Sequence, residues 1–175
     1  MSSDTSIFVG SLNDIAWVRI DGVATKDTSS CIRSFFSDRF AQGLRKFIID
    51  LKDCQLIDST FIGILTMLAG NVTAEGECGE VKVIHPNERN VKSICKLGLD
   101  NLITIDCGGE ESKDLETLIA SSLDRLESED IDKIEKSTMI LDAHETICSA
   151  NEKNRQEFGD VLTYLREDLD RATKD

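Results

Sequence analysis

The sequence predicts an α/β fold: a mixed β-sheet covered by crossover helices and followed by an α-helical hairpin. Two observations support this prediction. Within the first 110 residues, short β-rich runs alternate with segments of helical periodicity, as in folds that place helices on a sheet. From Ser112 onward only helical periodicity remains. We therefore expect a sheet domain over residues 1–110 and an acidic helical extension over residues 111–175.

The first elements are a β-hairpin and a helix. Residues 7–9 and 15–20 are β-rich runs, and Asn13-Asp14 between them predicts the turn. Gly22 is expected to end the second strand. Thr28-Ser29-Ser30 then predicts the cap of a helix whose apolar residues recur at spacings of three and four. These apolar residues are Cys31, Ile32, Phe35, Phe36 and Phe40.

The most informative stretch joins a buried strand to an apolar helix. Residues 47–51 form a mostly apolar run, as expected for a strand covered by helices. After a short loop, Asp58 stands where its carboxylate can accept hydrogen bonds from the first free N–H groups of a helix. The hydroxyls of Ser59 and Thr60 follow in the first turn, where the helix dipole favours negative charge. A phosphate on Ser59 would gain from that dipole and be repelled by Asp58, which is the layout of a switch.

The rest of the sheet domain continues the alternation. Residues 81–84 predict a strand, and Pro86 precedes a helix that contains Val91, Ile94, Cys95 and Leu97. Gly98 is expected at the left-handed end of that helix. Residues 102–105 predict a last strand, and a linker follows.

The extension predicts three amphipathic helices, of which the last two form a hairpin over roughly residues 131–172, with a tight connection at residues 149–154. Its formal charge is −8 (9 Lys+Arg against 17 Asp+Glu in residues 112–175), and −5 remains for residues 1–111 (11 against 16). Amphipathic helices rarely stand alone in water, so these must pack on each other, on the sheet domain or on another chain. The apolar stripe expected for the first helix is Leu115, Leu118, Ile119, Leu123 and Leu126.

Composition excludes several classes of function. The net charge of −13 disfavours nucleic acid and anionic membranes as partners. There is no signal peptide and no transmembrane run, so we expect a cytoplasmic protein. The six cysteines lack C-x-x-C spacing, which predicts small buried side chains in a reducing compartment rather than a zinc site. No catalytic constellation is recognisable, so we expect neither an enzyme nor a cofactor or metal.

His144 lies on the second predicted helix of the extension. A phosphorelay histidine on a helical bundle is one interpretation of it. The residues that follow, Glu145-Thr146-Ile147-Cys148, lack the Lys and Gly usual shortly after such a histidine. We therefore expect a packed structural histidine.

Asp50-Leu51 and Ile57-Asp58-Ser59-Thr60, in their strand–helix context, resemble the STAS domain of bacterial anti-sigma-factor antagonists. The resemblance covers about residues 5–110. It implies a partner switch in which the unphosphorylated domain binds a serine kinase that is also an anti-sigma factor. The kinase phosphorylates the hydroxyl at the position of Ser59, the modified form dissociates, and a serine phosphatase restores it.

The sequence departs from the family pattern at two places. Phe61 stands where the family commonly has Gly, and its ring belongs either to the core or to the docking surface. Thr25 stands where the loop after Gly22 usually carries an Asp, and Asp27 is close by. We expect Ser59 to be the phosphoacceptor with Thr60 as second candidate, and Asp58, Phe61 and Thr25 to line the partner interface.

The expected function is a regulatory interaction module, an anti-sigma-factor antagonist controlled by phosphorylation of Ser59. The alternative is a non-switching scaffold in which the C-terminal helices mediate oligomerisation, for instance as a homodimer, and Ser59 is silent.

Overall fold

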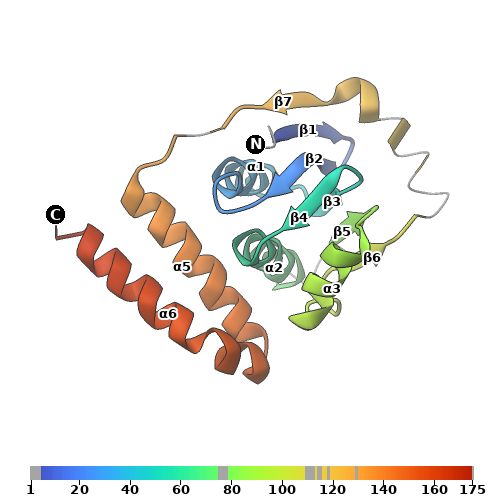
Figure 1. The fold of residues 1–175 in the computed structure, drawn as a ribbon. Coiled ribbons are helices and arrows are strands. Elements are labelled where there is room, and N and C mark those ends of the chain that lie inside the picture. Colours follow the sequence, from blue (N-terminus) through green and yellow to red (C-terminus); the bar gives the residue numbers. More distant parts are fainter. Residues whose placement is uncertain are drawn as a thin grey trace.

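The computed structural model describes residues 5–74, 79–108, 113, 116, 117, 119–128 and 130–174. Its centre is a seven-stranded sheet in the order β6-β5-β3-β2-β1-β7, with β4 paired to the far end of β2 (Figure 1). Strands β2, β3, β5 and β6 run parallel, while β1 and β7 are antiparallel to their neighbours. The mixed sheet with crossover helices is therefore confirmed. The strands are β1 (Ser6–Leu12), β2 (Ile15–Ala24), β3 (Lys46–Asp50), β4 (Cys54–Ile57), β5 (Glu80–Ile84), β6 (Thr104–Asp106) and β7 (Asp124–Leu126).

The predicted β-hairpin is present, but its second strand is longer than expected. Leu12 pairs with Ile15 across a two-residue turn, in which Asn13 has a φ of +55°. Gly22 does not end β2. It has a φ of +117° and lies where the pairing register shifts, so the strand bends there and continues to Ala24 alongside β4.

Strands β4 and β7 differ from the sequence prediction. The segment before Asp58 is predicted as a loop, yet it is β4, which pairs in parallel with β2. The prediction of Leu123 and Leu126 on a helix is wrong, because residues 124–126 form β7 and pair with β1. An edge strand such as β1 presents unpaired backbone groups, and β7 satisfies some of them. Leu115 and Leu118 of the same stripe lie outside the described residues.

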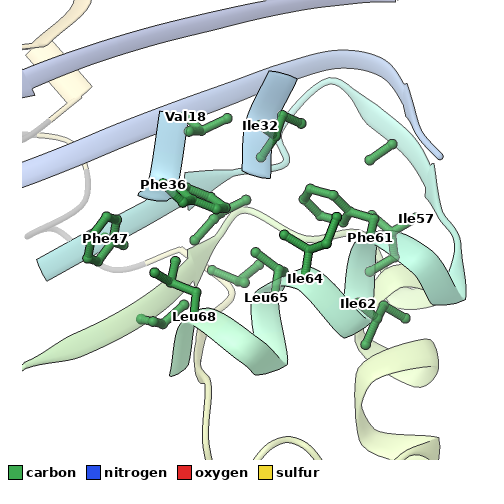
Figure 2. Packing of buried hydrophobic residues seen from close by; sticks show 14 of the residues in the cluster. Val18, Ile32, Phe36, Phe47, Ile57, Phe61, Ile62, Ile64, Leu65 and Leu68 are labelled. Carbon is green, nitrogen blue, oxygen red and sulfur yellow. The ribbon is translucent and has the colours of Figure 1, made fainter. Parts of the chain in front are cut away.

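The main core lies between one face of the sheet and helices α1 (Ser29–Ala41) and α2 (Ser59–Ala74). Figure 2 shows side chains of the sheet, α1 and α2 meeting in this layer, among them Val18, Phe36, Phe47 and Leu65. Helix α2 is buried on nearly every side, including at Ile62 and Thr66. A helix of this kind is covered by protein on more than its sheet-facing side. The side of α2 that faces away from the sheet is covered by the C-terminal helices.

Those helices form the predicted hairpin. Helix α5 (Lys133–Ala150) and helix α6 (Glu152–Ala172) lie side by side, and α5 packs on α2 (Figure 1). Asn151 alone connects them, and its side chain caps α6 by accepting a hydrogen bond from Asn154 N at 2.8 Å.

The sequence also predicts how α3 ends and how α1 begins. Helix α3 (Glu88–Lys96) is followed by Gly98 in the left-handed region, as predicted. Its start is capped by the side chain of Asn87, which was not predicted from the sequence. Thr28 occupies the N-cap of α1, but its hydroxyl bonds to Thr25 instead of the helix.

The cysteine prediction holds for three of the five described cysteines. Cys31, Cys54 and Cys148 are buried, and burial raises the pKa of the Cys54 and Cys148 thiols. Cys95 and Cys107 are exposed, contrary to expectation. Among the described helices, none combines the length and apolar character needed to cross a membrane.

Candidate functional site

Asp58 joins β4 to α2 and holds three backbone groups in place. Its N–H donates to Ala24 O at 2.9 Å, which fixes it against the end of β2. Its Oδ1 accepts from Phe61 N at 2.9 Å, and its Oδ2 accepts from Lys26 N at 2.8 Å. The carboxylate therefore caps α2, as the sequence predicts, and also fixes the loop between β2 and α1 beside the start of α2.

The three residues after Asp58 differ in exposure. Ser59 is half-buried, while Thr60 is only 3% exposed. Phe61 is fully buried in the core between α2 and the sheet (Figure 2). The expectation that Phe61 lines an interface is therefore wrong for its ring, and only its backbone N–H belongs to the site. Of the two hydroxyls, Ser59 is the one closer to solvent.

Thr25 lies in the turn between β2 and α1, beside the site but turned into its own loop. Its carbonyl accepts from Thr28 N at 3.0 Å and from Ser29 Oγ at 2.8 Å. Asp27 in the same loop forms an ion pair with Lys136 of α5, and this hydrogen bond lowers the pKa of the Asp27 carboxyl. The loop thus contacts the helical hairpin as well as Asp58.

His144 of α5 contacts the Ser59 hydroxyl, which the sequence did not predict. Ser59 Oγ lies 3.0 Å from His144 Nε2, and His144 Nδ1 lies 2.8 Å from Ile140 O. Because a carbonyl can only accept, Nδ1 carries the proton, and in the neutral ring Nε2 accepts from the Ser59 hydroxyl. His144 is 5% exposed, and its ring centroid lies 5.8 Å from that of Phe158 on α6. His144 is therefore the packed histidine that we expected, but its partner is the candidate phosphoacceptor.

A close helix crossing holds His144 in this position. A Cβ added at Gly63 of α2 would lie 2.4 Å from Ala143 O and 2.7 Å from Ala143 Cβ. Only a glycine lets the two helices approach this far. A glycine inside an otherwise apolar helix was the available sequence signal for such a crossing, but nothing in the sequence named the partner helix.

The site brings together the capping carboxylate of Asp58, the hydroxyl of Ser59, the loop of Thr25 and the imidazole of His144. A serine hydroxyl at a helix start can accept a phosphoryl group, and the N-terminal end of the helix favours the added charge. In the described state that hydroxyl already has a hydrogen-bond partner within its own chain.

Comparison with solved structures identifies the fold as that of anti-sigma factor antagonists, the STAS fold. TM1081 of Thermotoga maritima, a candidate anti-sigma factor antagonist, matches with a TM-score of 0.54 and 18% identity over 61% of this chain and 91% of its own. An anti-sigma factor antagonist from Mycobacterium paratuberculosis matches with a TM-score of 0.55 and 15% identity over 66% and 97%.

The antagonist SpoIIAA in its unphosphorylated form matches with a TM-score of 0.51 and 14% identity over 64% of this chain and 96% of its own. No protein-family model matches the chain, and no curated protein does. These three structures are covered almost completely, whereas about a third of this chain has no counterpart in them.

Proposed function

We propose that this chain is a non-catalytic cytoplasmic regulator, an anti-sigma-factor antagonist in a partner-switching pathway, and that Ser59 is its phosphoacceptor. Its partners are then an anti-sigma factor with serine kinase activity and a serine phosphatase. The observation that carries the proposal is the half-buried Ser59 at the start of α2, directly after the capping residue Asp58, in the fold of the antagonists.

The chemistry of the site favours Ser59 over Thr60. In the transfer, Ser59 Oγ loses its proton, bonds to the γ-phosphorus of ATP, and ADP leaves. Thr60 is 3% exposed, so a kinase would have to unfold the start of α2 to reach it.

The added phosphate would change the surface without refolding the domain. It brings about −1.5 to −2 charge units next to the Asp58 carboxylate. Asp58 already accepts the Phe61 and Lys26 N–H groups, so the phosphate competes with it for donors. Repulsion and added bulk at one point are sufficient to weaken a docked interface.

The first experiment is intact-mass and phosphopeptide analysis of the protein purified from its native cells. We expect a single phosphate on Ser59 that disappears in Ser59→Ala and persists in the matched control Thr60→Ser. In pull-downs, Ser59→Asp should recover less of the kinase partner than Ser59→Ala does. If no phosphate is found under growth, stress and stationary conditions, the proposal is wrong.

A scaffold is the second candidate, and exposed apolar side chains on α6 favour it. Val161 is 38% exposed and Tyr164 is 61% exposed, three residues apart on the helix. Neighbouring exposed apolar groups are typical of surfaces that contact another chain. Light scattering would test this, since Tyr164→Glu should then convert a dimer to a monomer. A monomer before and after the substitution would exclude the homodimer.

A further inference from the structure

The C-terminal hairpin covers the face of the sheet domain that carries Ser59. Helix α5 packs across α2 (Figure 1), and its residues Met139, Ala143 and Ile147 are buried. His144 lies in the same stretch and contacts Ser59 Oγ. A protein that docks around Ser59 therefore meets α5 first.

Polar contacts fix the hairpin at both of its ends. Near the start of α5, Lys136 pairs with Asp27 of the β2–α1 loop, and in the middle of α5 Asp142 pairs with Arg33 of α1 at 3.1 Å. These ties come from the same loop and helix that flank Asp58. The hairpin thus contacts the elements on which a partner of Ser59 would dock.

At the other end, the connection between α5 and α6 is attached to the end of α3. The side-chain amide nitrogens of Asn151 and Asn154 both donate to Leu97 O, at 2.9 and 2.8 Å. These bonds satisfy a carbonyl that the end of α3 leaves free. This end is fixed by hydrogen bonds, while the middle of α5 is held by packing, by the Asp142–Arg33 pair and by the His144–Ser59 contact.

We propose that the hairpin is an intramolecular competitor for the docking surface, so that the kinase partner must displace α5 from α2 before it can reach Ser59. This inference rests on the proposed function, because it assumes that Ser59 is the phosphoacceptor. In the closed state the hydroxyl donates to His144 of α5. The kinase needs that hydroxyl free and in line with ATP.

Phosphorylation in turn keeps the hairpin displaced. The phosphoester oxygen has no hydrogen to donate to His144. One turn along α2 from Ser59, the two helices approach too closely for one extra methyl group at Gly63, so a phosphate on Ser59 would add bulk beside a tight crossing. Arg33 and Lys136 of the neighbouring elements are already paired with carboxylates.

Two substitutions should release the hairpin from either side of the crossing. Gly63→Ala enlarges α2 against Ala143 O, and Ala143→Leu enlarges α5 against Gly63. Matched controls exist on α2 and on the second helix of the hairpin, because an added Cβ at Gly70 of α2 or Gly159 of α6 meets nothing within 4 Å. Gly70→Ala and Gly159→Ala should therefore leave the hairpin closed.

The first readout is the reaction of the full-length protein with diethyl pyrocarbonate, which modifies accessible unprotonated imidazole nitrogens. His144 should react slowly in the unsubstituted protein and in both controls. In Gly63→Ala and Ala143→Leu its rate should rise roughly tenfold or more, since overpacking shifts the closed–open equilibrium by that order. His85, the other histidine of the chain, is the internal reference and should not change. If His144 reacts in the unsubstituted protein as fast as in a short peptide, or stays protected in both release variants, the competitor model is overturned.

The second readout is the fraction of Ser59 that carries phosphate in native cells. We expect this fraction to rise in the two release variants and to remain unchanged in the two controls. Equal phosphorylation in all variants, with His144 exposed only in the release variants, would overturn the competitor model and leave the proposed function intact. An absence of phosphate in every variant would instead overturn the proposed function.

Discussion

The sheet domain and the C-terminal hairpin differ in how much apolar surface each buries. The domain buries apolar side chains on both faces of its sheet, with the larger core under α1 and α2 and a second cluster around Trp17 and Ile48. The hairpin buries one side of α5, while in α6 only Asn154 and Leu162 are buried. Stability is therefore unevenly distributed, and the hairpin is the part expected to open at least cost.

The difference in charge points in the same direction. Residues 112–175 carry −8, from 9 basic and 17 acidic residues, although they are about a third of the chain. An acidic segment on an acidic protein gains nothing from the overall field and depends on specific pairs such as Arg33–Asp142. The hairpin can therefore be held in one position by such pairs and still be displaced by a partner that breaks them.

The largest effect should come from the core of the sheet domain. Phe47 on β3 is fully buried and packs edge-on against Phe36 with ring centroids 5.7 Å apart. Phe47→Ala should lower the free energy of unfolding by about 3–5 kcal/mol, because it removes a large side chain and leaves a cavity. Urea denaturation should show the domain and the hairpin unfolding together. If Phe47→Ala destabilises only the hairpin, the sheet domain is not the more stable of the two regions.

A smaller, local loss of stability is expected from a substitution where α5 contacts the sheet domain. Ile147 of α5 is fully buried, and Ile147→Ala should cost roughly 2–4 kcal/mol of hairpin docking. Amide hydrogen exchange should then accelerate in α5 and α6 while β2, β3 and β5 stay protected. Val161→Ala on the exposed side of α6 is the control and should change little. Equal acceleration in the central strands would mean that the hairpin and the domain unfold as one unit.

The sequence predicts the residues at the start of α2 better than it predicts the packing of α5 against them. The apolar period of α2 and the Asp-Ser-Thr at its start locate Asp58 and Ser59 correctly, because capping is local chemistry. The same period places Phe61 on the buried stripe with Ile64, Leu65 and Leu68, so its burial was available from the pattern. Phe61 was assigned to the interface because the family commonly has Gly at its position. That comparison does not show where the Phe61 ring points.

The elements that were missed are those with too little sequence to show a period. Strand β4 has four residues and β7 has three, and both are defined by their partners β2 and β1. The docking of α5 on α2 is a different case. An amphipathic stripe shows that one face of a helix is buried, but it does not show against what. His144 could be predicted as packed, while its contact with Ser59 depends on tertiary structure alone.

The attachment at the end of α3 tests how much of the hairpin depends on polar contacts. Asn154 is fully buried, and its amide donates to Leu97 O at 2.8 Å and to Ile147 O at 3.2 Å. Asn154→Ala should cost about 1–3 kcal/mol, because it leaves buried carbonyls with fewer donors. Thermal unfolding followed by circular dichroism measures the loss. Gln156→Ala, at an exposed position of the same helix, is the matched control, and an equal shift in both variants would refute a specific role for Asn154.

The smallest effect should be the response of the hairpin to acid. The hydrogen bond from Lys136 lowers the pKa of Asp27 from an ordinary value of 3.8, and the one from Lys96 lowers the pKa of Glu157 from 4.5. A carboxyl whose folded pKa is lowered contributes stability that is complete above its ordinary pKa and is lost as pH falls through the lowered value.

Protection of α5 and α6 against hydrogen exchange should therefore fall modestly as the pH drops below the ordinary carboxyl values and through the lowered pKa values of Asp27 and Glu157. The effect is small because both pairs are exposed to solvent and are screened by salt. The double variant Asp27→Asn, Glu157→Gln should show weaker protection at neutral pH and a flatter response to acid. If the double variant responds to acid as strongly as the unsubstituted protein, the response comes from other carboxylates. Apolar packing would then be the dominant interaction that holds the hairpin.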